Sequence, residues 1–208
     1  DQKIDVRLVG NIGNPVLLEK KITNKTIFVI EASSYQLEYS KLFKSNISLI
    51  LNVSPDHLER HRTIKKYVRA KFKLIKNQST NDVAILNTKN FYIKKELKSK
   101  KFLPKIIKIE KDLKDDFLKK INNLYFNSDG NKENLKFVLE VAKVLKLKKS
   151  SLFKTPPTLP LDSITLSNSK NPQYPAKYVM ITGDKYLSGP RTAVNNKLEI
   201  DAATNLNN

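Results

Sequence analysis

The sequence predicts an α/β fold, with a mainly parallel sheet flanked by helices. Short apolar runs alternate along the chain with longer segments of helical periodicity, as expected where strands and helices alternate. The runs are also unbroken, as in IFVI at 27–30, which is typical of strands buried on both faces. The 208 residues, 39% of them hydrophobic, suffice for one ordinary domain and part of a second.

The predicted strands are the short apolar runs, and the predicted helices are the longer amphipathic segments between them. Strands are expected at 26–31 (TIFVIE), 47–53 (ISLILNV), 82–87 (DVAILN) and 106–109 (IIKI). Helices are expected at 14–21, roughly 58–77, 90–98, 112–121 and 131–147. The last of these carries an apolar stripe of Leu135, Val138, Leu139, Ala142 and Leu145, which indicates ordinary core packing.

The character of the chain changes after about residue 154. Six of the nine prolines lie in 155–208, and there only YVMI at 178–181 is predicted as a strand. We therefore divide the chain into a partial α/β domain at 1–154, truncated at its amino end, and an irregular tail at 155–208. This tail is expected to be divergent, out of frame or disordered.

Composition excludes several classes of protein. The chain has no cysteine, which excludes disulfides and thiolate metal sites and fits a reducing, cytoplasmic compartment. No segment approaches the roughly 18 apolar residues of a membrane span. The opening DQKIDVRLVG is charged and has no initiator Met, so we expect it to be an interior point of a longer protein.

The net charge of +19 raises the alternative of a basic nucleic-acid-binding module. Only five of the 39 basic residues are Arg, the residue expected for bidentate readout of bases and phosphates. The lysines are scattered, as in KKELKSKK at 94–101, without repeated aromatic neighbours. The charge pattern therefore favours a solvated lysine-rich surface, and no nucleic-acid partner is expected.

Glu31 and Asn52 are candidate ligand-binding residues because each follows a predicted parallel strand. Ligands collect beyond the carboxyl ends of such strands. A carboxylate reached through four apolar residues suits a Mg²⁺ ion near phosphates. A salt-bridged Glu is the alternative.

The only two histidines, His57 and His61, are spaced i,i+4, so a zinc site must be considered. The zinc-protease pattern needs Glu directly after the first His, but Leu58 holds that place. A two-histidine zinc protease is therefore disfavoured. A helix-start histidine bonded to its loop is the other interpretation of His57.

Lys71 points with the apolar stripe of its predicted helix, at i+4 from Tyr67 and i+3 from Val68. An inward Lys needs a partner or loses its charge, unless it snorkels to the edge of the stripe.

Nearer the start of the chain, GNIGNP at 10–15 can bring backbone close to a ligand or form a simple turn. It is not a phosphate-binding Walker A loop, because no Lys-Ser or Lys-Thr follows the glycines.

In this order and spacing, GNIGNP, EASSYQLE, LNVSPDHLERH and YVRAK resemble the central domain of the Mur ligases, a P-loop-NTPase-like domain. Within that family, SSYQLE is similar to the branch that adds D-glutamate to UDP-N-acetylmuramoyl-L-alanine. The resemblance covers roughly residues 8–147. A folate-adding ligase of the same superfamily is an alternative.

The resemblance implies an ATP- and Mg²⁺-dependent amide ligase of peptidoglycan precursor synthesis, acting through an acyl phosphate. It places the enzyme in the cytoplasm as a monomer that serves cell-wall biogenesis, cell shape and cell division. Its two substrates would be UDP-N-acetylmuramoyl-L-alanine and D-glutamate.

The resemblance also implies the role of each site residue. Glu31 and His57 would ligate Mg²⁺, and Lys71 would be a carbamylated lysine beside the metal. Asn11 and Ser33 would touch the muramoyl substrate. Two further residues, Asn131 and Asn134, would lie by the nucleotide base, although Gly130 stands where the family usually has His.

One element of the family is not found in the sequence. The phosphate-gripping G-x-x-G-K-[ST] loop, expected upstream of GNIG, does not occur in the 208 residues. The chain alone is therefore expected to be inactive.

Overall fold

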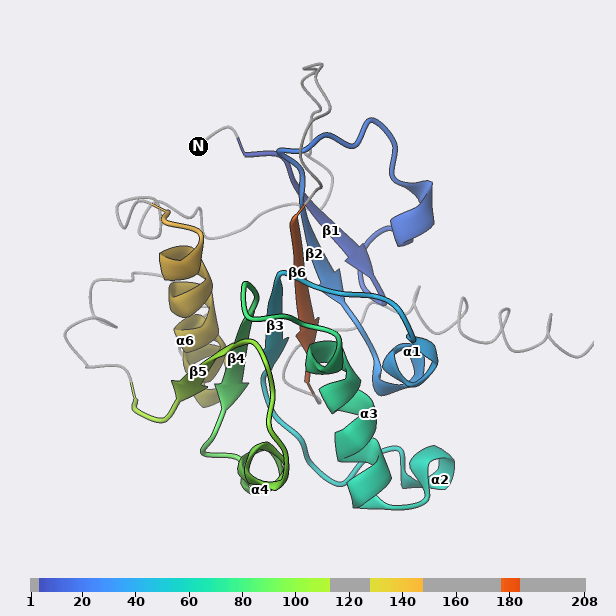
Figure 1. Cartoon of the computed structure of the whole chain (residues 1–208), viewed down its shortest axis with the longest axis vertical. Helices are drawn as coiled ribbons and strands as arrows, with labels where there is room; N and C mark the ends of the chain where they lie inside the picture. The colour runs from blue at the N-terminus through green and yellow to red at the C-terminus, as the bar shows by residue number, and fades with distance from the viewer. Residues whose placement is uncertain (1–3, 113–127, 148–176, 184–208) are drawn as a thin grey trace, which may run out of the picture.

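The computed structural model describes residues 4–112, 128–147 and 177–183, which form a six-stranded sheet with helices on both faces (Figure 1). The strand order is β1-β2-β6-β3-β4-β5, and every neighbouring pair is parallel. The predicted α/β class with a mainly parallel sheet is confirmed.

Four of the predicted strands are observed to within one residue at each end, and the strand predicted at 47–53 ends early, at Ile50. One strand, the first, was not predicted. The observed bounds are β1 Val6–Gly10, β2 Ile27–Glu31, β3 Ile47–Ile50, β4 Val83–Asn87, β5 Lys105–Ile109 and β6 Lys177–Thr182.

The helices follow the prediction less closely. The structure has α1 Ser34–Tyr39, α2 Leu58–His61, α3 Ile64–Lys76, α4 Phe91–Ser99 and α6 Asp129–Val144. The helix predicted at 14–21 is wrong, because only a 3-10 turn, η1 Val16–Leu18, forms there. The single helix predicted at 58–77 is also wrong, since it breaks at Arg62, whose φ of 63° is left-handed. All but the first residue of the helix predicted at 112–121 lies outside the described residues.

The last strand of the described residues, β6, lies in the middle of the sheet. β6 pairs with β2 on one side and with β3 on the other, so it separates two strands that are consecutive in the sequence. The strand predicted at 178–181 is thus confirmed, and it belongs to the same sheet as the strands of the first 154 residues. The rest of the predicted tail lies outside the described residues, apart from Gly183.

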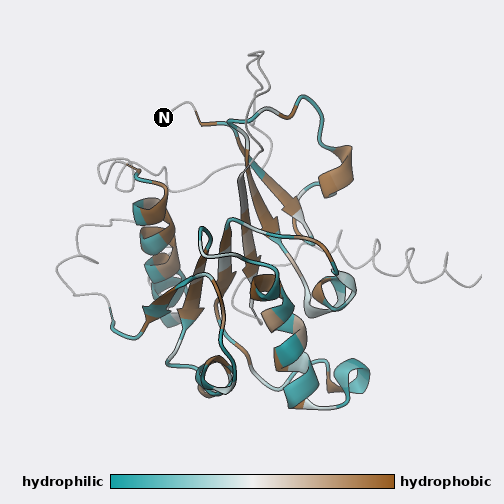
Figure 2. Ribbon diagram, viewed as in Figure 1, coloured by the Kyte–Doolittle hydropathy of each residue, from teal (hydrophilic) through white to brown (hydrophobic). Residues whose placement is uncertain are grey.

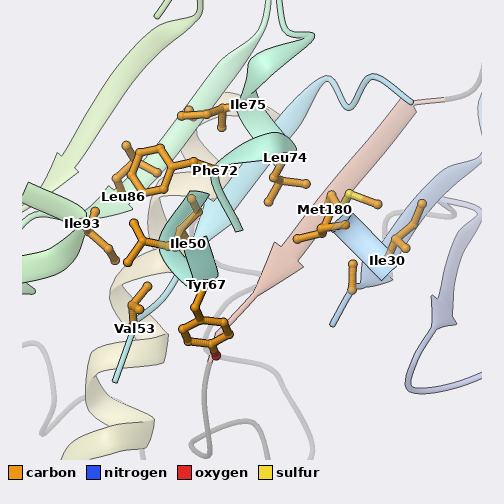
Figure 3. Packing of buried hydrophobic residues seen from close by; sticks show 14 of the residues in the cluster. Ile30, Ile50, Val53, Tyr67, Phe72, Leu74, Ile75, Leu86, Ile93 and Met180 are labelled. Carbon is orange, nitrogen blue, oxygen red and sulfur yellow. The ribbon is translucent and has the colours of Figure 1, made fainter. Parts of the chain in front are cut away.

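Two apolar layers sandwich the sheet. On one face, α1, α3 and α4 pack through Leu37, Phe72 and Ile93 against strand residues that include Ile30 and Met180 (Figure 3). On the other face, α6 contributes residues that include Phe137 and Val141. The strands are mainly brown in Figure 2, whereas α3 and α6 alternate brown and teal, as expected of helices with one buried side.

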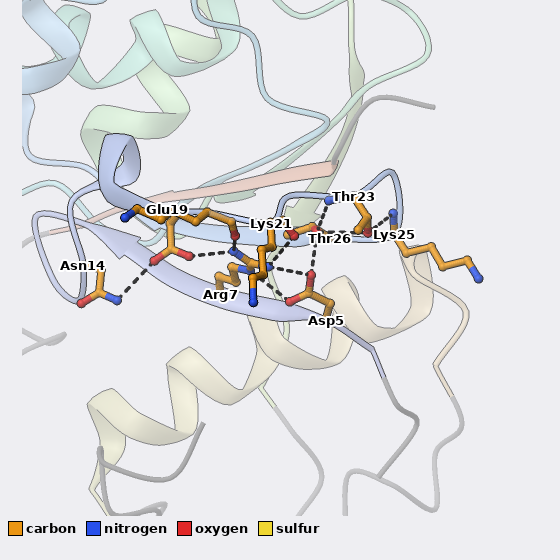
Figure 4. A network of polar contacts seen from close by, with 9 residues as sticks. Asp5, Arg7, Asn14, Glu19, Lys21, Thr23, Lys25 and Thr26 are labelled. Carbon is orange, nitrogen blue, oxygen red and sulfur yellow. Dashed lines mark hydrogen bonds and ion pairs between the residues drawn. The ribbon is translucent and has the colours of Figure 1, made fainter. Parts of the chain in front are cut away.

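Arg7, on edge strand β1, is buried in a polar network at the start of the sheet (Figure 4). Its guanidinium forms a two-pronged contact with Asp5, with both N···O distances 3.1 Å, and donates to Glu19 Oε2 at 3.0 Å. The carbonyls of Lys20 and Lys21 accept its remaining N–H groups. All five donors of the guanidinium are therefore used, and the network fixes the segment between β1 and β2.

Among the described residues, no helix is long and apolar enough to cross a membrane.

Candidate active site at the carboxyl edge of the sheet

Residues from three neighbouring strands gather at one edge of the sheet. Because the strands are parallel, their carboxyl ends lie at the same edge. Glu31 ends β2, Thr182 ends β6, and Asn52 follows β3 by two residues. Backbone bonds tie these ends together: Ala32 N donates to Ile181 O at 2.9 Å, and Leu51 N donates to Thr182 O at 3.0 Å.

The glycines of GNIGNP let the loop after β1 fold back on the sheet. A Cβ on Gly10, where φ is 111°, would lie 2.2 Å from the Glu31 carbonyl oxygen. At Gly13, with a φ of 87°, it would lie 2.5 Å from the Leu8 carbonyl oxygen. Only glycine permits so close an approach in this conformation. The simple turn, one of the two interpretations of this motif, therefore accounts for both glycines.

Asn11 is brought against Glu31 by this turn. Its backbone N–H donates to the Glu31 carbonyl at 2.9 Å, and its side chain hydrogen-bonds to the Glu31 carboxylate. The structure thus joins two of the predicted site residues directly.

Glu31 is a carboxylate only partly satisfied by its surroundings. Burial raises its pKa above the ordinary value, while the Asn11 hydrogen bond and the positive charge of Lys71 act to lower it. Its Oε2 atom is buried and accepts no hydrogen bond from the part of the chain that the structure describes. Burying a charged oxygen without a hydrogen-bond donor is energetically costly. This atom is therefore suited to bind a cation.

Lys71 points into the molecule, as predicted, and its side chain is 2% exposed. Its Nζ donates to Thr182 Oγ1 and to the Gly183 carbonyl, both at 3.2 Å. The ammonium also lies 4.9 Å from the centre of the Tyr67 ring, close enough for a cation–π contact. The alternative of snorkelling to solvent is therefore wrong.

His57 begins α2 with a left-handed φ of 53° and is bonded to the loop around it, as one interpretation expected. Its Nδ1 lies 3.1 Å from Tyr35 Oη, and its backbone N–H donates to Asp56 Oδ1 at 2.9 Å. The His57 and Tyr67 ring centres are 6.0 Å apart. Tyr67 therefore touches both Lys71 and His57, and the positive charge of Lys71 acts in turn on Glu31.

His61 does not share a metal site with His57. It is buried, its Nε2 lies 3.0 Å from Ser34 Oγ, and burial lowers its pKa. Within the described ranges, no three His, Cys, Asp or Glu side chains gather as a metal cluster. The zinc alternative has no support in this geometry.

Ser33 has a local structural role. It caps α1, with its Oγ accepting from Gln36 N at 3.3 Å and its own N–H donating to Gln36 Oε1 at 3.0 Å. This reciprocal capping box is visible in the sequence as S-x-x-Q at 33–36. A contact between Ser33 and a substrate stays a prediction.

Asn131 and Asn134 lie in the first turns of α6, but neither caps it. Ser128 is the cap, and it accepts from Asn131 N at 3.3 Å. The first turn of α6 is joined to the carboxyl end of β4 through Glu133, which accepts from Asn87 Nδ2 at 3.1 Å. The two asparagines therefore lie near a strand end, and a contact with a nucleotide base stays a prediction.

A magnesium ion would be held at this edge by few protein groups. Glu31 offers a buried carboxylate oxygen, the ligand type that Mg²⁺ prefers. Mg²⁺ commonly uses one or two carboxylates together with water and substrate phosphates, so the small number of acidic side chains fits this metal. The residues present are compatible with Mg²⁺ and give no support for a site made of protein ligands alone.

These features define an α/β domain with a candidate nucleotide- and metal-dependent site at the carboxyl edge of its sheet. The family model described as the Mur ligase middle domain matches residues 7–151. The chain belongs to this family.

Several curated relatives of this chain carry the name UDP-N-acetylmuramoylalanine–D-glutamate ligase. The protein of that name from Lachnoclostridium phytofermentans is 43% identical over 90 residues, which is 43% of this chain and 20% of the relative. The one from Alkaliphilus metalliredigens is 49% identical over 82 residues, 38% of this chain and 18% of the relative. The one from Clostridioides difficile is 43% identical over 86 residues, 41% of this chain and 19% of the relative. The chain thus matches about a fifth of the length of these relatives.

Thr182, Gly183 and Tyr67 were missed as site residues. Tyr67 was taken only as part of the apolar stripe. Thr182 and Gly183 lie in the segment assigned to the tail, and no sequence signal places that segment beside Lys71. Only the pairing of β6 with β2 and β3 shows it.

Proposed function

We propose that this chain contributes the middle domain of an ATP-dependent ligase that joins D-glutamate to UDP-N-acetylmuramoyl-L-alanine. The observation that carries the proposal is the buried Oε2 of Glu31, which accepts no hydrogen bond from the described residues and is acted on by the charge of Lys71, in a chain similar to several proteins of that enzyme name. The reaction would pass through an acyl phosphate, which the D-glutamate amine attacks to form the amide. As one of the Mur ligases, the enzyme would act in the cytoplasm on a peptidoglycan precursor.

The protein groups at the edge would bind and orient the reactants and balance charge. Glu31 and His57 would hold Mg²⁺, which when bound neutralises phosphate charge and favours phosphoryl transfer. Asn11 would orient the Glu31 carboxylate, which it already bonds. Tyr35 would fix the His57 ring through its contact with Nδ1.

Lys71 would act as a carbamate rather than as an ammonium. Its neutral amine would add to CO₂, forming an N–C bond and releasing one proton, so that a buried cation becomes an anion beside the metal. Support comes from its 2% exposure and from the action of its charge on Glu31, whose Oε2 accepts no hydrogen bond within the described ranges.

A chimera tests the proposal. Residues 7–112 of this chain would replace the matching segment of the Lachnoclostridium phytofermentans relative, and ADP and amide product would be measured with both substrates. We expect an active chimera that loses about 100-fold or more in rate with Lys71→Ala, the scale for removing one preorganised charge. The matched control is Lys76→Ala, an exposed lysine on the same helix, which should leave the rate unchanged.

Two results would count against the proposal. One is an active chimera that tolerates Lys71→Ala and Glu31→Gln. The other is ADP formation by the unmodified 208-residue chain, since it has no G-x-x-G-K-[ST] loop to hold the triphosphate.

A further inference from the structure

The gap between β2 and β3 is filled by a strand from far along the chain. β6 is in register with β2 from Ile27–Lys177 to Glu31–Ile181 and with β3 from Ile47–Val179 to Ile50–Thr182. Beyond the strands, the N–H groups of Ala32 and Leu51 donate to carbonyls of β6. Residues 1–147 therefore supply two half-sheets, β1-β2 and β3-β4-β5, and β6 joins them.

Each half-sheet presents a strand edge that needs a partner. Without a strand between them, the facing N–H and C=O groups of β2 and β3 would lie unpaired in an apolar setting, which is costly. The flanking side chains are apolar on both sides: Ile30 and Ile50 on the α3 face, and Leu49 on the α6 face. The gap thus has the properties of a site for an extended peptide, in which main-chain bonds give affinity and side-chain pockets give selectivity.

The pockets define what sequence fits. Val179 and Ile181 of β6 pack in the cluster that contains α6, whereas Met180 packs with Ile30 in the opposite cluster (Figure 3). Thr182 is fully buried, and its hydroxyl accepts from Lys71 Nζ. A Cβ on Gly183 would lie 3.1 Å from Leu51 Cβ, so the position after the hydroxyl favours glycine.

We propose that the gap between β2 and β3 is a binding slot for a peptide that enters as a parallel strand. The peptide would carry three consecutive apolar residues, whose side chains face alternate sides of the sheet, followed by Thr-Gly. β6 occupies it within the chain, and a separate peptide of the same pattern can replace it. The slot also has a chemical consequence, because the strand that enters it brings a hydroxyl and a carbonyl to Lys71. This inference does not depend on the proposed ligase activity.

The test must allow for competition between β6, which is tethered to the chain, and the free peptide for the same slot. A tethered strand has an effective concentration of order millimolar, so a free peptide competes poorly with an intact β6. Met180→Asp in the full chain places a carboxylate in the apolar layer under α3, in register with Ile30 of β2 and Ser48 of β3, and weakens β6 alone. The probe is a fluorescent peptide of residues 176–185, AKYVMITGDK, and the control is the same peptide carrying Met180→Asp.

We expect the labelled peptide to bind the Met180→Asp chain at least tenfold more tightly than the unmodified chain. Hydrogen exchange should show faster exchange of the Ala32 and Leu51 amides in the variant, and the peptide should restore their protection. The amide of Ile85, in β4 between two intact neighbours, should stay protected throughout. The control peptide should neither bind nor protect.

A milder substitution and a disulfide cross-link serve as further checks, in case Met180→Asp disturbs more than β6. If Met180→Asp also exposes Ile85, the milder Met180→Ala takes its place. Because the chain has no cysteine, Val29→Cys with Val179→Cys gives one defined disulfide that locks β6 against β2, and oxidation should lower peptide binding at least tenfold.

Three outcomes would overturn the proposal. The first is a folded variant chain whose Ala32 and Leu51 amides the peptide does not protect. The second is equal binding of the two peptides. The third is global loss of protection in both Met180 variants, which would mean that no slot exists without its own strand.

Discussion

Two carboxylates on neighbouring strands of this sheet have opposite environments. Asp5, just before β1, contacts Arg7 with both oxygens and also accepts from Thr26 Oγ1 at 2.6 Å. Its pKa is lowered, first of all by the Arg7 hydrogen bonds. Glu31, at the end of β2, has one oxygen without a donor among the described residues, and burial raises its pKa.

The difference separates a structural network from a candidate site. Around Arg7, every guanidinium donor is used, and the second oxygen of Glu19 is taken by Asn14 Nδ2 at 3.2 Å. Such a network holds the β1–β2 connection and leaves nothing over for a ligand. Around Glu31, one carboxylate oxygen can still accept a hydrogen bond, and the buried charge is incompletely balanced. Unsatisfied buried groups with perturbed pKa values are typical of functional sites.

Arg7→Ala should have the largest effect, because it breaks the network from its centre. It leaves the carboxylates of Asp5 and Glu19 without their buried cation, and loss of one partner of a buried pair costs about 3–5 kcal/mol in free energy of unfolding. Urea denaturation measures the change. The matched control is Arg69→Ala, an exposed arginine on α3, which should stay within about 0.5 kcal/mol. Equal losses of stability in the two variants would show that the Arg7 network contributes no more than an exposed arginine.

Gly10→Ala should come next, because it disturbs the turn that seats Asn11 on Glu31. The new Cβ would meet the Glu31 carbonyl oxygen at 2.2 Å in a left-handed backbone. We expect a loss of about 1–3 kcal/mol in free energy of unfolding, the usual cost of such strain. Gly183→Ala is a useful comparison by thermal melting, since its nearest contact is 3.1 Å and it should lose less. A stable Gly10→Ala protein would contradict the turn geometry.

Addition of Mg²⁺ should stabilise the unmodified chain through Glu31. At ten times its dissociation constant, a ligand that binds only the folded state adds ~1.4 kcal/mol to the free energy of unfolding. Melting curves in MgCl₂ and in EDTA measure the effect, and Glu31→Gln should abolish it. Asp112→Asn, which alters an exposed carboxylate between Lys89 and Lys136, should not. A gain from Mg²⁺ that survives Glu31→Gln would assign the ion to another place.

Glu31→Gln should have the smallest effect on stability, and that effect should be positive at neutral pH. The folded pKa of Glu31 is raised above 4.5, so the native state holds a proton more readily than the unfolded state. Stability is therefore lost as the pH rises from about 4.5 through the folded pKa. Replacing the charge by an amide should add about 1 kcal/mol at pH 7, the scale of an unsatisfied buried group.

Asp5 contributes the opposite dependence of the free energy of unfolding on pH. Its folded pKa lies below 3.8, so its contribution is present above that pH and is lost as the pH falls through the folded value. Denaturation at pH 4 and pH 8 should show the Glu31→Gln gain growing with pH. Asp5→Asn should instead lose stability at pH 8. Parallel pH profiles for the two variants would show that their environments do not differ.

The strands buried on both faces were predictable from sequence, and the exceptions have physical reasons. β1 was missed because VRLVG has a charge at its second position, and burial of Arg7 depends on Asp5 and Glu19, which no local pattern reveals. The helix predicted at 14–21 fails because Leu17 and Leu18 find no apolar surface and remain 97% and 68% exposed. Periodicity alone cannot supply a surface to pack against.

The phase of α6 was also predicted imperfectly. The expected stripe included Val138, which is 48% exposed, and omitted Phe137, which is 1% exposed. Leu135 and Ala142 were placed correctly in the core. The larger aromatic side chain determines which side of the helix faces the sheet, a tertiary choice that spacing does not contain.

At the site, the resemblance implied that Glu31, Asn11 and Lys71 belong together; in the structure Asn11 bonds to Glu31 and the charge of Lys71 acts on it, while their roles stay predictions. It could not predict that Thr182 and Gly183 hold the Lys71 amine, because that contact joins residues more than half the chain apart. Local patterns carry no information about which strand fills the centre of a sheet.

The position of β6 has a consequence for biosynthesis. A ribosome adds roughly 5–20 residues per second and releases the amino end first, so early segments normally fold while later ones are still being made. Here the strand that joins the two half-sheets begins at Lys177 of 208 residues. Completion of the sheet must wait until this strand has been made, long after β2 and β3, and during that interval the nascent chain displays two open strand edges that chaperones would have to shield.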